Sequence, residues 1–337
     1  MKTTLSIYLL IFGFQCYAQK SDFESIDFNK ADRVALEFKN ESLNSLPELS
    51  HKLTSNLTTE VERFRAIYIW VCNNIANDYA QYSKNMRKRQ RFKNDSLKLE
   101  NWNQKFRKTS FETLLSHQKT ICTGYAHLVK ELARLADIDC EIVHGFAKTS
   151  TINIDHLDVP NHSWIAVKLD AKWYLCDPTW ASGIPNPSTL RFEFKYNDGY
   201  FLANPKLFAI NHYPEDKKWL LIDKDEPSFE MFLEAPIIYG KAYEHLKSYE
   251  SPKKMHNTII KNETITFEFQ PIKSVELKDI GLSIDSGNSN YKIHPKMIKL
   301  DGDSIILKHK FEHTGFYDVH LYIGTDLIST HTFKVKS

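Results

Sequence analysis

The order of hydrophobic patterns along the chain is the feature that most limits its fold. Between Thr58 and Ile75, apolar residues recur at spacings of three and four, the pattern of an amphipathic helix, and a second such helix follows position 122. Three strand-like runs come next, at 140–146, 163–169 and 173–176. Asp170 and Ala171, between the last two runs, suit a hairpin turn. Helices followed by an antiparallel sheet predict an α+β fold.

A second pattern begins after a polar stretch near residue 250. Short strand-like runs recur there, separated by turn residues, at 264–269, 280–284, 304–309, 317–323 and 330–335. Strands at this spacing predict a small β-sandwich. We therefore expect an N-terminal segment at 19–57, a main α+β domain at 58–249 and a C-terminal β-sandwich domain at 250–337.

The first eighteen residues have the pattern of a secretion signal. Lys2 precedes an apolar stretch from Leu5 to Phe14 that is too short to span a bilayer, and Ala18 provides a small residue for cleavage. We therefore predict a signal peptide at 1–18 and an exported protein, periplasmic or extracellular. No later stretch is long and apolar enough to predict a transmembrane segment.

The net charge and the distribution of charge indicate different things about binding partners. The formal net charge is only +2, so no global field attracts nucleic acid or an anionic membrane, and no nucleic-acid partner is expected. Residues 82–108 are rich in Lys and Arg and poor in acidic residues. A solvated helix or insertion loop explains this basic insertion, and an anionic surface polymer is the alternative partner.

Cys122 differs from the other cysteines of the predicted mature chain. It lies where a loop meets the start of a helix, and the free N–H groups and dipole at such an end favour the reactive thiolate. Cys72, Cys140 and Cys176 lie in apolar runs, which predicts buried, inert thiols. No pair has C-x-x-C spacing, and a zinc site built on Cys122 would not match known ligand spacing, so we expect no metal or cofactor.

His162 and Asp177 are predicted to become neighbours. His162 starts one strand and Asp177 ends the next, and the hairpin between them brings these two ends together. A carboxylate in that position can hold the imidazole in one tautomer and stabilise its charged form. With Cys122 they would form an activated nucleophile. The alternative is that all three are buried structural residues.

These segments resemble a known family. Cys122-Thr123-Gly124-Tyr125-Ala126, His162-Ser163-Trp164 and the run from Trp173 to Trp180 look like the transglutaminase-like superfamily, in its bacterial and kyphoscoliosis-peptidase-like branch. The resemblance covers roughly Val61 to Ile222. It implies a papain-like transglutaminase core at 58–249, with Cys122 as nucleophile, His162 as general base and acid, and Asp177 as the orienting carboxylate.

The oxyanion hole is less well defined. Thr120-Ile121 and Asn77 depart from the family pattern around the nucleophile. We expect the backbone N–H of Cys122 as one donor. For the second donor the candidates are Gln118, Tyr79 and Trp102. Trp164 and Trp180 are expected in the core or in the walls of a substrate cleft.

The function implied is an exported cysteine enzyme that forms a thioester from a peptide or side-chain amide. Water as the acceptor gives a peptidase or amidase, and an amine gives a transglutaminase; resemblance to exported bacterial members favours hydrolysis. The partner would be a protein or peptide substrate. A non-catalytic binding or scaffold protein at the cell surface is the alternative.

Overall fold

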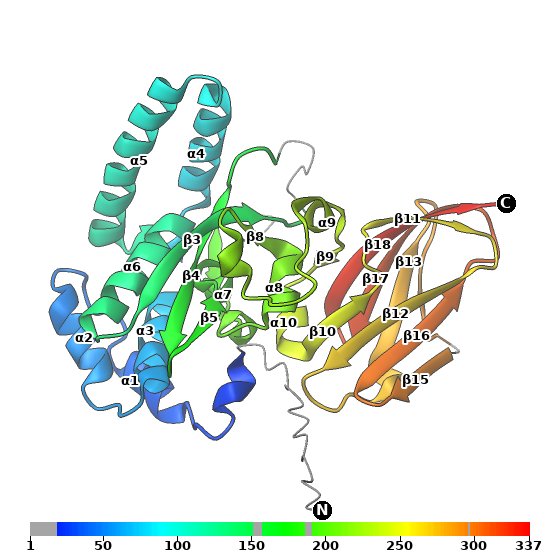
Figure 1. The fold of residues 1–337 in the computed structure, drawn as a ribbon, viewed down its shortest axis with the longest axis horizontal. Helices are drawn as coiled ribbons and strands as arrows, with labels where there is room; N and C mark the ends of the chain where they lie inside the picture. Colours follow the sequence, from blue (N-terminus) through cyan, green and yellow to red (C-terminus); the bar gives the residue numbers. More distant parts are fainter. Residues whose placement is uncertain (1–18, 151–156, 186–190, 296) are drawn as a thin grey trace, which may run out of the picture.

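The computed structural model describes residues 19–150, 157–185, 191–295 and 297–337 (Figure 1). The predicted signal peptide lies outside the described residues. Within the described ranges, no helix is long and apolar enough to span a membrane.

The helical layer is built around α3, Glu60–Asn74. It begins at a capping box, in which Thr59 Oγ1 accepts from the Glu62 amide at 3.2 Å and the Glu62 carboxylate accepts from the Thr59 amide at 3.1 Å. The apolar stripe predicted from Thr58 to Ile75 is therefore confirmed as a helix. Helices α1 Asn29–Glu37 and α2 Leu46–Thr54 pack beside it, and η1 Lys20–Phe23 precedes them, with Phe23 against Tyr174.

The central sheet has the strand order β5-β4-β3-β8 and is antiparallel throughout. Its strands are β3 Cys140–Ala147, β4 His162–Leu169, β5 Lys172–Cys176 and β8 His212–Pro214. Asp170 and Ala171 form the β4–β5 turn with φ of 48° and 67°, as a tight hairpin requires. Helix α6, Cys122–Leu135, packs against β3 and β4.

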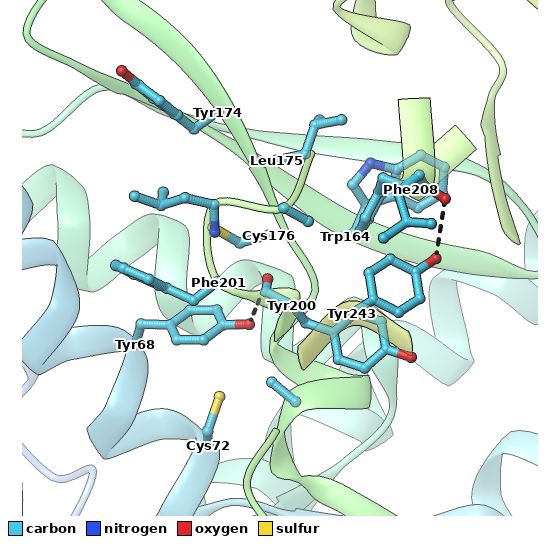
Figure 2. Packing of buried hydrophobic residues seen from close by; sticks show 14 of the residues in the cluster. Tyr68, Cys72, Trp164, Tyr174, Leu175, Cys176, Tyr200, Phe201, Phe208 and Tyr243 are labelled. Carbon is cyan, nitrogen blue, oxygen red and sulfur yellow. Dashed lines mark hydrogen bonds between the residues drawn. The ribbon is translucent and has the colours of Figure 1, made fainter. Parts of the chain in front are cut away.

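Behind the sheet lies an aromatic core. The Tyr68 hydroxyl donates to the Tyr200 carbonyl at 3.0 Å, and Phe201 packs between Tyr68 and β5 (Figure 2). Cys72 and Cys176 lie in this packing, fully buried. This core holds α3 and the sheet in a fixed relation, which in turn positions the ends of the strands.

The basic insertion folds as two antiparallel helices, α4 Tyr79–Phe92 and α5 Ser96–His117, that project beyond the rest of the fold (Figure 1). We call residues 79–117 the basic hairpin. A short parallel pair, β1 Ala76–Asn77 and β2 Lys119–Thr120, joins its two ends beneath it.

Short elements connect the sheet to the C-terminal region. They are α7 Pro178–Ser182, β6 Gly183–Pro185, β7 Phe192–Phe194, η3 Asp198–Tyr200, α8 Pro205–Asn211, η4 Lys217–Leu220, α9 Phe229–Glu234, β9 Ile237–Ile238 and α10 Ala242–His245.

The C-terminal region consists of two sheets, with orders β10-β12-β16-β15 and β11-β18-β17-β13-β14, and β9 also pairs with β18. The strands are β10 Leu246–Ser251, β11 His256–Ile260, β12 Thr264–Pro271, β13 Ile280–Asp285, β14 Asn290–Ile293, β15 Met297–Asp301, β16 Ser304–Lys310, β17 Gly315–Ile323 and β18 Asp326–Lys336; η5 Leu277–Asp279 precedes β13. Phe267, Phe269 and Phe333 are buried in it. The predicted fold class, helices on an antiparallel sheet followed by a region of β-strands, is confirmed.

Candidate active site

Asp177 lies at the centre of the site. It is fully buried at the end of β5 and is the N-cap of α7. Its Oδ1 accepts from the backbone amides of Thr179 at 2.9 Å and Trp180 at 3.1 Å, and Pro178 occupies the first helical position. The cap fixes the plane of the carboxylate, so Oδ2 is left for other donors.

Two histidines share Oδ2. His162 Nε2 lies 2.7 Å from it and His212 Nε2 lies 3.0 Å from it. His162 begins β4 and His212 begins β8, the two strands on either side of β3. The predicted contact between His162 and Asp177 is therefore confirmed, and His212 is an additional partner.

The two histidines differ in charge because their surroundings differ. Burial lowers the pKa of His212 to about 4, so His212 is neutral near pH 7 and can donate its Nε2–H to Asp177. Burial also acts on His162, but the charge and hydrogen bond of Asp177, together with Cys122, raise its pKa to about 10. Burial would raise the pKa of Asp177, yet the charge of His162 and the hydrogen bonds from both rings hold it well below its usual range.

Cys122 completes the group. It is the first residue of α6, only 6 % exposed, and the helix has no side-chain cap at Ile121. Burial would raise the pKa of the thiol, but a hydrogen bond from His162 and its charge lower it, assisted by the Ser163 backbone N–H. Because His162 Nε2 is held by Asp177, Nδ1 is the ring nitrogen left to exchange a proton with the thiol. These shifts favour a thiolate–imidazolium pair.

The other cysteines provide a contrast within the same chain. Cys72, Cys140 and Cys176 are unpaired and buried, and burial raises the pKa of each thiol. Their prediction as buried thiols is confirmed. Cys176 accepts from the Leu202 amide through its sulfur at 3.2 Å, so it is committed to the core.

Cys122 and His162 lie where two cavities adjoin. One, of about 360 Å³, is formed between the basic hairpin and α6, and the other, of about 890 Å³, extends toward β9 and β18. Tyr82 and Asn161 also line both. A chain lying in the two cavities would therefore pass the thiol.

Two of the predicted binding or oxyanion residues lie in the site. Tyr79 and Trp180 line the larger cavity together with Cys122. Trp180 also packs on the site histidines, with ring centroids 5.2 Å from His162 and 4.4 Å from His212. Trp164 is 1 % exposed and packs behind the same rings, so its placement is in the core.

The structure does not bring Gln118 and Trp102 to the thiol. Gln118 has a left-handed backbone at the end of α5, and its side-chain amide donates to the Glu41 carbonyl at 2.6 Å. The Trp102 indole donates to Asn85 Oδ1 at 2.9 Å and ties α5 to α4. Neither residue lines the two cavities. The prediction that Gln118 or Trp102 is an oxyanion donor is therefore wrong.

Two site residues were not singled out from the sequence. Tyr82 lies one helical turn after Tyr79, lines both cavities, and has its pKa raised by burial and by the charge of Cys122. His212 belongs to His212-Tyr213-Pro214, a run that also resembles the transglutaminase-like superfamily, but nothing in that run predicts a contact with Asp177. Its role depends on the pairing of β8 with β3, which no local pattern predicts.

Among the residues that the structure describes, His162, Asp177 and His212 bring their possible metal-ligand atoms within 4.8 Å of one another. All three are buried, and the hydrogen bond of each histidine to Asp177 accounts for the cluster. The arrangement fits a hydrogen-bonded charge network around Asp177.

Comparisons with known proteins find a matching domain family and several relatives. Residues 47–178 match the transglutaminase-like superfamily. Kyphoscoliosis peptidase of Homo sapiens is 36 % identical over 200 residues, which are 58 % of this chain and 27 % of the relative. The Mus musculus protein of the same name is 32 % identical over 72 % of this chain and 34 % of its own length. Hillarin of Drosophila melanogaster is 24 % identical over 63 % of this chain and 24 % of its own length.

The chain thus spans about a third or less of these curated relatives. A solved structure titled "Crystal structure of a TGase" is 17 % identical, covering 57 % of this chain and 40 % of that chain, with a TM-score of 0.28. Residues 47–178 therefore match the transglutaminase-like superfamily, and the chain is similar to kyphoscoliosis peptidase over a longer stretch.

Proposed function

We propose that the protein is an exported cysteine enzyme that cleaves peptide or side-chain amide bonds through a thioester. The observation that carries the proposal is the opposite pKa shift of Cys122 and His162 beside a buried Asp177, where two cavities adjoin. Such a shift prepares a nucleophile and its acid at the same position.

In the first half of the reaction, the Cys122 thiolate attacks the amide carbonyl carbon and a C–S bond forms. The carbonyl oxygen takes the negative charge. As the C–N bond breaks, the His162 imidazolium gives its Nδ1 proton to the leaving nitrogen, which departs as an amine. The product is an acyl thioester on Cys122 and a neutral His162.

In the second half, His162 takes a proton from water and the resulting hydroxide adds to the thioester. The C–S bond breaks, a carboxylic acid leaves, and the thiolate–imidazolium pair is restored. Asp177 remains ionised throughout and stabilises the imidazolium in both halves. Water is the proposed acceptor because the two mammalian relatives are named peptidases.

Two groups are proposed to bind the oxyanion. The backbone N–H of Cys122 is the first amide of α6, a position at which no carbonyl of the same helix accepts it. The Tyr82 hydroxyl is the second donor, because Tyr82 lines both cavities and is influenced by the charge of Cys122. Donors directed at a developing oxyanion often supply the largest single contribution to catalysis.

The test is alkylation by iodoacetamide near neutral pH, followed residue by residue by mass spectrometry. Cys122 should react far faster than Cys72, Cys140 and Cys176, and Cys122→Ala should abolish cleavage of a peptide library. Equal, slow alkylation of all four thiols would exclude the enzyme and leave the scaffold alternative. Incorporation of an added primary amine into product, in place of water, would assign cross-linking instead.

We also propose export through residues 1–18, on the pattern of Lys2, the apolar stretch and Ala18. Secretion from a bacterial host should yield a mature protein that starts at Gln19, as read by N-terminal sequencing. An intact Met1 on protein retained inside the cell would contradict this proposal.

A further inference from the structure

The basic hairpin concentrates the positive charge of the chain. Between Tyr79 and His117 the sequence has ten Lys and Arg and three Asp and Glu residues, a net charge of +7. Because the whole chain has a net charge of +2, the remaining residues sum to −5. Charge of one sign gathered on a projecting element creates a local field that attracts ligands of the opposite sign.

Most of these cations have no acidic partner among the residues that the structure describes. Two form ion pairs, Lys93 with Asp158 and Lys98 with Asp95. Arg89 donates to the Pro160 carbonyl at 2.8 Å. The exposed cations without an ion pair are Lys84, Arg87, Arg91, Lys105, Arg107 and Lys108. Their charges are therefore available to a ligand.

The base of the hairpin is a wall of the candidate site. Arg89 and Arg107 line the 360 Å³ cavity together with Cys122 and His162, and Glu215 is the carboxylate among its described lining residues. A hollow along α5, lined by Arg107, Lys108 and the carboxylate of Glu100, shares Arg107 with that cavity. A basic surface thus runs from the exposed hairpin to the thiol.

The larger cavity on the other side of Cys122 is basic as well. Lys148, Lys195 and Lys241 line it, and Glu244, paired with Lys241, is the carboxylate among the described lining residues. Lys148 is fully buried, its Nζ donates to the carbonyls of Phe232 and Ala235, and burial lowers its pKa to about 7, so it adds little charge for a ligand. Exposed Lys195 therefore places a positive charge on this side of the thiol as well.

We propose that the substrates are acidic polypeptide segments, in which Asp or Glu residues on either side of the reacting amide contact the basic hairpin and Lys195 of the larger cavity. The inference rests on the amide chemistry proposed above. It assigns the hairpin a role in substrate capture. Electrostatic complementarity of this kind acts mainly on encounter and on KM, since these cations are not at the reacting atoms.

A polypeptide fits these observations better than an anionic polysaccharide. The basic surface does not end on the exposed hairpin but continues into the cavity of Cys122 through Arg107 and Arg89. A ligand that follows it presents its backbone to a thiol suited to amides. A polysaccharide would use the hairpin alone and would offer no backbone amide to the thiol.

Binding can be measured apart from turnover in the full chain carrying Cys122→Ala. Fluorescence anisotropy would compare three labelled peptides of equal length, rich in Asp and Glu, in Asn and Gln, or in Lys, at low and at high salt. The acidic peptide should bind at least about tenfold more tightly than the neutral one at low salt, and the difference should shrink as salt screens the charges. Equal binding of the acidic and neutral peptides would overturn the inference.

Charge reversal tests whether the cations of the basic hairpin cause the preference for the acidic peptide. Arg87→Glu, Arg91→Glu and Lys105→Glu together should remove most of the preference for the acidic peptide, as they reverse exposed hairpin cations. Lys308→Glu, Lys310→Glu and Lys336→Glu change the total charge equally on exposed positions of the C-terminal sheets and should leave it nearly intact. An equal loss of this preference in the two triple variants would refute the role of the basic hairpin. Binding of an anionic polysaccharide by a protein that does not discriminate among the peptides would refute it as well.

The two proposals fail in different ways. If Cys122 of the wild type is not alkylated faster than the buried cysteines, the proposed amide chemistry fails whatever the peptides do. If Cys122 is alkylated preferentially but the acidic peptide has no advantage, only the substrate class fails.

Discussion

Replacing Asp177 by Asn tests how the buried carboxylate controls the thiol. Asn has nearly the same shape, but only one of its two terminal atoms accepts hydrogen bonds. The amides of Thr179 and Trp180 require an acceptor at the Oδ1 position, and Asn is a good N-cap residue. The amide NH₂ would then face the Nε2 atoms of His162 and His212. His162 would have to carry its proton on Nδ1, which is the wrong tautomer for accepting a proton from Cys122.

Loss of the Asp177 charge also works against the thiolate, because it lowers the pKa of His162. The size of this change can be estimated. Burial lowers the pKa of His162, and it is chiefly Asp177 that raises it from a usual value of 6.5 to about 10. Without the carboxylate, burial still lowers the pKa of His162 and only Cys122 still raises it, so the pKa should fall back to about its usual 6.5. A change of that extent corresponds to about 5 kcal/mol at roughly 1.4 kcal/mol per pKa unit. It agrees with the ~3–5 kcal/mol that loss of one partner costs a buried ion pair.

The pKa of the Cys122 thiol should rise in this variant, because burial raises it and the charge of His162 lowers it. Once His162 is neutral, burial dominates and the pKa of the thiol rises above its usual 9.0. Fewer than about one in a hundred thiols would then be ionised at pH 7. Alkylation of Cys122 at pH 7 should become as slow as that of the buried Cys72, and peptide cleavage should be lost.

The assay is the rate of Cys122 alkylation as a function of pH in the wild type and in Asp177→Asn. A matched control is Asp216→Asn, which replaces another N-cap aspartate that lines neither cavity and accepts from the Lys218 amide at 3.2 Å. The control should behave as the wild type. If Asp177→Asn remains folded and its Cys122 is alkylated at the wild-type rate at pH 7, Asp177 does not maintain the thiolate and the argument is refuted.

Three further results are expected. Cleavage should follow a bell-shaped pH profile, with an acid limb below pH 9 as the Cys122 thiolate gains a proton and an alkaline limb near pH 10 as His162 loses one, whereas alkylation should show the acid limb only. His212→Phe keeps a ring but removes a donor to the buried Asp177, so urea unfolding should show a loss of about 2 kcal/mol, and His212→Gln, which retains a donor, should lose less. Tyr82→Phe should lower kcat about a hundredfold while Cys122 alkylation changes little; an unchanged kcat would remove Tyr82 from the oxyanion hole.

The parts of the site that could be predicted are those fixed by local chemistry. The turn at Asp170 and Ala171 has two residues, and it pairs Leu169 with Lys172 as that length requires. The register then places Asp177 one step beyond β5, beside the start of β4, so its contact with His162 follows. The start of α6 at Cys122 is equally local.

The parts that could not be predicted depend on pairings between distant segments. His212 reaches Asp177 because β8 pairs with β3, where Ala147 lies opposite His212. A strand of three residues has no sequence pattern strong enough to identify its partner. The position of the Gln118 side chain is also not evident from the sequence. Gln118 has a left-handed backbone at the end of α5, and its side-chain amide binds the Glu41 carbonyl.

Asp177 shows how a local signal can determine a non-local arrangement. An Asp followed by Pro at a helix start is a capping pattern that can be read in the sequence. In the structure the cap fixes Oδ1 on the amides of α7, and this directs Oδ2 at the imidazoles that begin β4 and β8. The same side chain therefore ends a strand, begins a helix and sets the charge of His162. For this reason Asp177→Asn, which preserves the first two roles, isolates the third.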